Sequence, residues 1–278
     1  MTITRSSALA LPLPELAEHY LLDPNITFLN HGSFGACPRP VFATMQAYQR
    51  EIESNPVGFI GRRLPQLLAD ARQHLGDYLG AHADELAFVP NATQGINIIA
   101  RSLNLGPDDE ILATDHEYGA VNNTWNFNCA KTGARYVHQP IPTPISSPEA
   151  MVDALWAGVT ERTRVIAISH VTSPTALTFP LDLICQRARE AGIMTVVDGA
   201  HAPGQRDLAL DELGVDFYVG NCHKWLSSAR GAGFLYARFD RQELLEPLVV
   251  SHGWGRENST QSAFLDYFTW TGTDDPSA

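Results

Sequence analysis

The sequence has few charged side chains for its length and little positive charge in particular. Of its 278 residues, 18% are charged and 44% are hydrophobic, and the formal net charge is −12. No cluster of Lys and Arg residues occurs along the chain. Because nucleic acids and anionic membranes are bound through such clusters, the composition argues against both as partners. The length suffices for one large domain or two smaller ones.

Several chemical signatures are also missing. No GxSxG elbow marks a serine hydrolase, and no HExxH pair marks a metal site. No apolar run is long enough to span a membrane, and the first residues, interrupted by Pro12 and Pro14, contain no signal-peptide cleavage site. The cysteines form no CxxC pair, so we interpret them as reduced, small buried side chains of a cytoplasmic protein: Cys37, Cys129, Cys185 and Cys222.

Helix-like and strand-like segments alternate from about residue 40 onward. Amphipathic stretches predict helices at 40–54, 64–80, 96–106 (closed by Gly106), 118–133 and 181–192. Short apolar runs predict strands at 85–89, 110–114, 134–141, 163–171, 193–197, 215–220 and 231–238. This alternation predicts an α/β fold, with a mostly parallel sheet covered by helices on both faces.

Polar side chains follow five of the predicted strands. Ligands of such sheets bind beyond the carboxyl ends of the strands, so these side chains should meet at one edge. In chain order they are Asn91, Thr93 and Gly95; Asp115, His116 and Tyr118; Thr172 and Ser173; Asp198 and His201; and Asn221, His223 and Lys224.

Each of these residues also has an ordinary structural interpretation. Thr93 suits a helix N-cap, Asp198 suits a turn, and a single histidine is usually hydrogen-bonded in the core. The functional interpretation makes NATQG a phosphate cup at a helix start. It makes Asp198 the partner of a heterocyclic nitrogen and Lys224 a nucleophile, because partial burial beside Trp225 lowers a lysine pKa. A metal site built from Asp198, His201 and His223 would leave Lys224 unexplained, so we predict none.

Seven stretches carry a stronger signal together: FLNHGSFGACPRPV, NATQGIN, DHEYGAVNNTW, ISHVTSPTA, VDGAHAPGQ, GNCHKWL and WTGTDDPS. In this order they resemble the class V aminotransferases, pyridoxal-phosphate enzymes of fold type I, and within them the isopenicillin N epimerase-like branch. The resemblance covers most of the chain from about residue 26. It is specific for fold and cofactor and less so for reaction, because the superfamily includes aminotransferases, epimerases, desulfurases and carbon–sulfur lyases.

The resemblance implies catalytic roles at matching positions. Lys224 would bind pyridoxal 5'-phosphate (PLP) as a Schiff base, Asp198 would pair with the pyridine nitrogen, and His201 would lie near the phenolic oxygen. Tyr118, or less favourably His116, would stack on the ring. These roles agree with the residue chemistry, because a semi-buried lysine can lose its proton and a buried aspartate can keep a ring nitrogen protonated.

The resemblance also implies binding residues and a partner. The phosphate would be held by the Ala92 backbone, Thr93, Asn221 and His223, with Thr273 reaching across from the second subunit of a homodimer. Thr172 or Ser173 would lie over the ring edge. The residues bordering an amino-acid-like substrate would be His31 and Gly32.

The reaction that we favour on this resemblance is epimerisation, in which Lys224 removes the α-proton of the substrate and helps to return one to the opposite face. Aminotransfer and carbon–sulfur cleavage are alternative reactions. A catalytically silent binding protein that retains the fold is the alternative from another class. None of the four cysteines matches the mobile cysteine of desulfurases.

Domain boundaries follow from the same resemblance. We expect an N-terminal segment at 1–25, a large PLP-binding domain at 26–265 and, at 266–278, the start of a connection to a smaller C-terminal domain. Family members carry in that domain an arginine for the substrate carboxylate. Because the sequence ends at Ala278, we expect a fragment or a truncated product in which turnover is in doubt.

Overall fold

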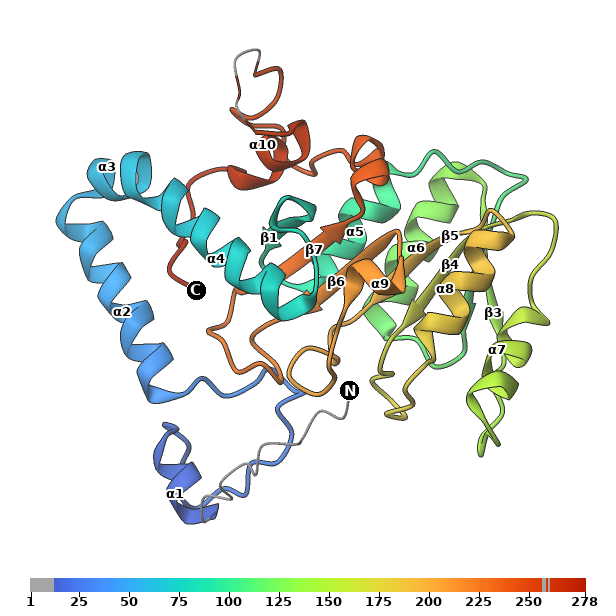
Figure 1. Ribbon diagram of the computed structural model, residues 1–278, viewed down its shortest axis with the longest axis horizontal. Helices are drawn as coiled ribbons and strands as arrows, with labels where there is room; N and C mark the ends of the chain where they lie inside the picture. The colour runs from blue at the N-terminus through green and yellow to red at the C-terminus, as the bar shows by residue number, and fades with distance from the viewer. Residues whose placement is uncertain (1–12, 257–258, 260) are drawn as a thin grey trace, which may run out of the picture.

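A seven-stranded sheet forms the centre of the computed structural model, which describes residues 13–256, 259 and 261–278 (Figure 1). The strand order is β1-β7-β6-β5-β4-β2-β3. The strands are β1 (Leu86–Val89), β2 (Glu110–Thr114), β3 (Arg135–Gln139), β4 (Thr163–Ser169), β5 (Met194–Asp198), β6 (Phe217–Asn221) and β7 (Gly233–Ala237).

The sheet is parallel except for β7. Strands β2 to β6 pair in parallel, whereas β7 runs antiparallel to both of its neighbours, β1 and β6. The carboxyl ends of β2, β4, β5 and β6 therefore lie at one edge, and the predicted mostly parallel α/β sheet is confirmed. The reversal at β7 was not predicted, because an apolar run does not reveal its own direction.

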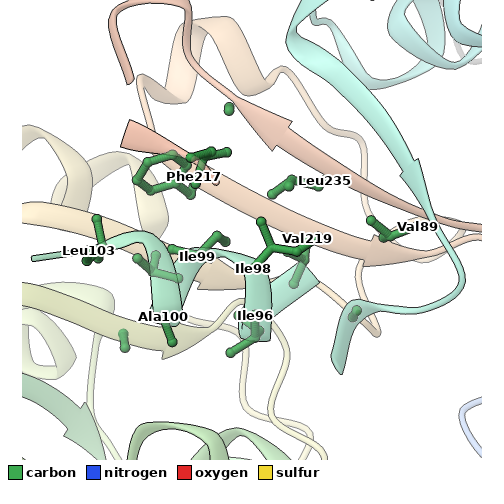
Figure 2. Close-up of a cluster of buried hydrophobic side chains, with 14 of the residues drawn as sticks. Val89, Ile96, Ile98, Ile99, Ala100, Leu103, Phe217, Val219 and Leu235 are labelled. Atoms are coloured by element: carbon green, nitrogen blue, oxygen red, sulfur yellow. The ribbon is translucent and has the colours of Figure 1, made fainter. Parts of the chain in front are cut away.

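Helices cover both faces of the sheet (Figure 1). On one face α5 (Ala92–Ser102), α6 (Gly119–Thr132) and α10 (Ala263–Thr269) pack over one core, and on the other α7 (Pro148–Trp156), α8 (Leu181–Glu190) and α9 (Leu210–Leu213) pack over a second. Each fully buried aliphatic or aromatic side chain contributes about 1.5–3 kcal/mol to folding. Figure 2 shows part of the first core, formed by Ile96, Ile98 and Ile99 of α5 with Phe217 and Val219 of β6 and Leu235 of β7.

Helices α1 (Leu13–Glu18), α2 (Arg39–Ser54) and α3 (Pro56–Gly58) extend away from the sheet, whereas α4 (Leu64–Leu79) packs beside β1 (Figure 1). In the part of the chain that the structure describes, every helix is too short or too polar to cross a membrane. The remaining helical segments are the π-helix η1 (Phe59–Arg63) and the 3-10 helices η2 (Ala83–Glu85) and η3 (Phe239–Leu244).

The helix predicted at 96–106 has different ends in the structure. Helix α5 begins at Ala92 because the Asn91 side chain accepts a hydrogen bond from the Gln94 N–H at 2.9 Å. It ends at Ser102, and Gly106 lies beyond it in a turn closed by Asp109 Oδ2, which accepts from the Gly106 N–H at 2.8 Å. The prediction that Gly106 closes the helix is therefore wrong. Helix α7, capped by Ser147, was not predicted.

Candidate active site

Lys224 lies at the centre of the carboxyl edge of the sheet, three residues after β6 ends at Asn221. Its Nζ is 3.2 Å from His201 Nε2 and 6.0 Å from the centroid of the Tyr118 ring. Burial lowers the pKa of the Lys224 amine, and the charge of Asp198 partly opposes this shift. The structure thus brings together four of the predicted residues from three different strand ends.

Asp198 is the last residue of β5 and is buried. Its Oδ1 accepts a hydrogen bond from the Ala200 N–H at 2.9 Å. Burial raises the pKa of this carboxyl group, against the effects of the Ala200 hydrogen bond and the Lys224 charge. Among the described residues no cation lies within ion-pair distance of it. A buried carboxylate is costly without a cationic partner, so Asp198 is suited to a ligand that supplies one.

His201 connects Lys224 to an aromatic neighbour. Its Nδ1 lies 3.2 Å from Trp225 Nε1, on the side of the ring opposite Lys224. Burial, together with the nearby Lys224 charge, lowers the pKa of His201 to about 4. His201 is therefore neutral near pH 7.

The start of α5 lies beside Lys224, Asp198 and His201, and two of its N–H groups, those of Ala92 and Gln94, already donate to the side chains of Asn221 and Asn91. Asn221 Oδ1 accepts from the Ala92 N–H at 2.8 Å, which ties the end of β6 to the first turn of the helix. Thr93 is exposed on that turn. Gly95 lets the helix approach β6, because a Cβ there would lie 2.6 Å from Val219 Cγ1. A helix start carries partial positive charge, so this corner favours an anion.

His223 and the ring-stacking candidates differ in how they are held. His223 Nδ1 is 3.1 Å from the Ala232 carbonyl oxygen, and burial lowers its pKa. His116 is buried, with its ring nitrogens 2.9 Å from Thr175 Oγ1 and 3.0 Å from the Ile141 carbonyl oxygen. Tyr118 precedes α6 and is 46% exposed. Its ring is the more open of the two.

The loop of residues 31–35 borders Lys224 and His201. Gly32 lies against His201, since a Cβ there would be 2.9 Å from His201 Cε1. Gly35, at φ +69°, lies against the His223 carbonyl group, where a side chain would not fit. The His31 ring centroid lies 6.1 Å from that of Trp225. The predicted substrate loop therefore rests on the Lys224 segment.

Three predicted residues remain, and among the residues that the structure describes there is no contact between them and Lys224: Thr172, Ser173 and Thr273. Thr172 is buried and closes the turn after β4, where its Oγ1 accepts from the Leu177 N–H at 2.8 Å. Ser173 is exposed on the same turn. Thr273 is exposed after α10, and no contact joins it to Lys224 within the described residues.

Glu117 is a buried carboxyl group that the sequence interpretation left without a role. It accepts hydrogen bonds from Thr114 Oγ1 and Ser169 Oγ, both at 2.6 Å, and so joins the ends of β2 and β4. Burial raises its pKa to about 7, and the neighbouring Asp198 charge adds to the shift. Its position shortly after a strand and directly before Tyr118 was the available signal.

A cavity of about 610 Å³ lies beside the cluster rather than over it. It is mostly apolar, and neither Lys224, Asp198 nor His201 lines it. Its walls come from α4, the loop after Lys224 and the C-terminal segment, including Leu64, Leu68, Leu226 and Trp270. We therefore place the candidate active site at Lys224, Asp198 and His201, where the ionisable groups converge, and not in this cavity.

The comparison with known families agrees with this arrangement. Residues 28–271 match the family described as Aminotransferase class-V. The chain therefore belongs to the class V aminotransferase family.

Individual relatives differ in reaction. The isopenicillin N epimerase of Amycolatopsis lactamdurans is 40% identical over 249 residues, which are 88% of this chain and 62% of the relative. The putative L-cysteine desulfhydrase 2 of Oryza sativa subsp. japonica is 32% identical over 95% of this chain and 57% of its own length. The chain thus spans about three fifths of the length of these curated relatives.

Solved structures share the fold. The cystine C–S lyase C-DES, in complex with its product cysteine persulfide, superposes with a TM-score of 0.82 at 25% identity, over 95% of this chain and 70% of the lyase. A C-DES variant with glycine covalently linked to its PLP cofactor superposes at 0.80 and 24% identity, over 94% and 69% of the two chains. These matches confirm the large-domain fold of type I PLP enzymes.

Proposed function

We propose that this chain is a PLP-dependent enzyme that acts at the α-carbon of an amino-acid-like substrate. The observation that carries the proposal is the half-buried Lys224 amine at the carboxyl edge of the sheet, next to His201 and close to the buried Asp198. The family match and the PLP of the C-DES variant support the choice of cofactor.

The residues present fit this cofactor. Asp198 is a buried carboxylate that lacks a cation among the described residues, and a protonated pyridine nitrogen is such a cation. The start of α5, with Thr93, and the end of β6, with Asn221, form a corner suited to a phosphate group. The Tyr118 ring is open enough to stack on a flat heterocycle.

When bound, PLP supplies an electron-accepting ring that stabilises negative charge at the substrate α-carbon. Side chains of this protein have separate roles in that chemistry. Asp198 holds a proton at the ring nitrogen, and Thr93, Asn221 and His223 bind the phosphate. Lys224 Nζ binds the cofactor and moves the α-proton, for which an amine with a lowered pKa is suited.

Within this class we propose epimerase-like chemistry. The isopenicillin N epimerase relative, at 40% identity, supports it. Lys224 Nζ takes the proton from one face of the α-carbon, and a proton is returned to the opposite face. Carbon–sulfur cleavage is the second candidate, because the C–S lyase C-DES and a cysteine desulfhydrase are also similar to this chain. Aminotransfer is the third.

The products separate these reactions. The protein loaded with PLP is incubated in heavy water with candidate amino acids. Solvent deuterium at the α-carbon with loss of chirality supports epimerisation, sulfide with pyruvate supports cleavage, and a 2-oxo acid supports aminotransfer. If no candidate reacts and no PLP binds, the proposal is wrong and the chain is a silent member of the fold.

We further propose a homodimer whose active sites are shared between subunits. The support is the position of Thr273, which the family resemblance assigns to the neighbouring site. Within one chain its segment is held elsewhere, since Asp275 Oδ2 accepts from Gln49 Nε2 of α2 at 2.7 Å.

A further inference from the structure

Three side chains at the site form a line of hydrogen bonds. Trp225 Nε1 lies 3.2 Å from His201 Nδ1, and His201 Nε2 lies 3.2 Å from Lys224 Nζ. An indole N–H can donate a hydrogen bond but cannot accept one. His201 Nδ1 must therefore be the acceptor, which places the single proton of the neutral imidazole on Nε2.

The position of that proton decides what Lys224 can do. With a hydrogen on Nε2, His201 donates toward Lys224 Nζ. A protonated lysine has three donors and no acceptor, so only the uncharged amine can complete this hydrogen bond. A charged Lys224 could donate to Nε2 only if the proton of His201 moved to Nδ1, where it would face the Trp225 N–H.

We propose that Trp225 is a positioning residue whose indole N–H fixes the tautomer of His201 and thereby favours the uncharged, nucleophilic amine of Lys224. The proposal deepens the proposed function. It rests on that function in one respect only, namely that the uncharged Lys224 amine is the group that binds PLP. Trp225 itself is not placed in contact with the reacting atoms.

The surrounding backbone holds the line in place. A Cβ on Gly32 would lie 2.9 Å from His201 Cε1, so the loop packs directly on the imidazole. Gly204, at φ +87°, lies against the Trp225 main chain. The His31 ring packs 6.1 Å from the Trp225 ring. The loop at Gly32 therefore restricts the His201 ring, and the loop at Gly204 holds the Trp225 backbone.

Other ionisable groups also act on the Lys224 amine. Asp198 favours its charged form and burial opposes that form. His223 is close enough for the Lys224 charge to lower its own pKa, and the Tyr118 ring lies 6.0 Å from Nζ. The doubly protonated form of His201 is disfavoured, since its pKa is lowered to about 4. The Trp225 N–H therefore acts on a histidine that is already neutral.

The chain provides a convenient internal reference for the test. Its lysines are Lys224 and Lys131, and Lys131 is exposed near the end of α6. In the cofactor-free protein, an amine-modifying reagent reports the uncharged fraction of each lysine, read by mass spectrometry of the two peptides. Nitrogen-15 NMR of labelled histidine reports which nitrogen of His201 carries the proton.

Trp225→Phe removes the N–H and keeps an aromatic ring. We expect the Lys224/Lys131 modification ratio near pH 7 to fall about fivefold, the effect of one ordinary hydrogen bond on an equilibrium. The pH midpoint of Lys224 modification should rise accordingly. Trp254→Phe is the matched control, because Trp254 is 51% exposed and stacks on Tyr267; its ratio should equal that of the wild type.

His201→Gln replaces the central residue of the hydrogen-bonded line that runs from Trp225 through His201 to Lys224. We expect it to change the Lys224/Lys131 ratio, and adding Trp225→Phe to it should change the ratio no further, because both substitutions act through one path. An unchanged ratio in folded Trp225→Phe, or a wild-type His201 protonated at Nδ1, overturns the inference. Because all readouts are cofactor-free, failure of PLP to bind Lys224 would contradict the proposed function and leave this result standing.

Discussion

Asp198 has an unfavourable environment in the candidate site. Its carboxyl group is buried and has one backbone N–H as its hydrogen-bond donor among the described residues, and its pKa is raised. A protein retains such a group at a cost of stability unless a ligand compensates it. We therefore expect PLP to stabilise the fold and Asp198 to control the reactivity of the bound cofactor.

Asp198→Asn keeps an acceptor for the Ala200 N–H but cannot hold the ring nitrogen protonated. We expect PLP to bind, more weakly, and exchange of the substrate α-proton in heavy water to slow roughly a thousandfold, about 4 kcal/mol of barrier. Asp115→Asn is the control, because Asp115 follows β2 at the same edge of the sheet and likewise accepts a backbone N–H, that of Ile141, at 2.9 Å. Exchange in Asp198→Asn within about tenfold of wild type would make Asp198 an ordinary turn residue.

The site residues were predictable to different degrees from the sequence. Asp198 directly follows the apolar run at 193–197, and Lys224 comes shortly after the run at 215–220, so the rule on strand ends finds both. Trp225 was noted only as a sign of burial. Its contact with His201, 24 positions earlier in the chain, depends on how two loops cross and has no periodic signal. Glu117 lacked a role because its partners, Thr114 and Ser169, come from two strands.

At the scale of elements, the contact between α5 and β6 determines how the phosphate corner forms. Gly95 is buried on the helix face that meets the strand, and its hydrogen atom takes the place where a Cβ would meet Val219. In an open helix position, alanine in place of glycine usually stabilises a protein. Here the lack of space should reverse that effect.

Gly95→Ala should lower the free energy of unfolding by about 1–3 kcal/mol, because the added methyl group pushes α5 away from β6. It should also weaken PLP binding, since Ala92 and Thr93 move with the helix. Gly119→Ala, at the start of α6 where a Cβ meets nothing within 4 Å, should be neutral or slightly stabilising. Urea denaturation of both variants measures this, and equal stabilities would contradict the packing account.

Element boundaries were harder to predict than element types. Helix α5 was expected because of its apolar spacing, but its start depends on the hydrogen bond that the Asn91 side chain accepts from the Gln94 N–H. A single hydrogen bond of this kind leaves no periodic pattern in the sequence. Strand β7 was expected from its apolar run, whereas its direction is set by the short return from Asn221 to Gly233.

At the scale of the whole molecule, buried ionisable groups make stability depend on pH. Burial raises the pKa of Glu117 from 4.5 to about 7. The folded protein therefore holds a proton that the unfolded chain releases, so this group lowers the free energy of unfolding as the pH rises from about 4.5 to about 7. His170 and His201, with pKa values lowered to about 4, act in the opposite direction between about 4 and 6.5.

Glu117→Gln isolates the carboxyl contribution. Relative to wild type, the variant should gain about 2 kcal/mol of unfolding free energy between about pH 5 and pH 8, because the glutamine does not titrate. The measurement is urea denaturation of both proteins across this range. If the free energies of unfolding of the two proteins change in parallel with pH, Glu117 is ionised in the folded state across this pH range. The raised pKa given to Glu117 is then wrong.

The homodimer with shared active sites that we propose can be tested with mixed dimers. Mixed dimers of Thr273→Ala and Lys224→Ala subunits would contain one site that lacks both groups and one that retains both. Titration with PLP should then show one normal site per mixed dimer. Two equally weakened sites would place Thr273 and Lys224 of one site in the same chain.

The central claim is that Lys224 binds PLP covalently. Borohydride reduction of the protein incubated with PLP, followed by peptide mass spectrometry, tests it directly, because the chain offers Lys131 as its other lysine. Lys131 is exposed and lies 4.4 Å from the centroid of the Phe127 ring. The account predicts the cofactor mass on the peptide that contains Lys224 and none on the Lys131 peptide. Cofactor on Lys131, or on neither lysine, would contradict it.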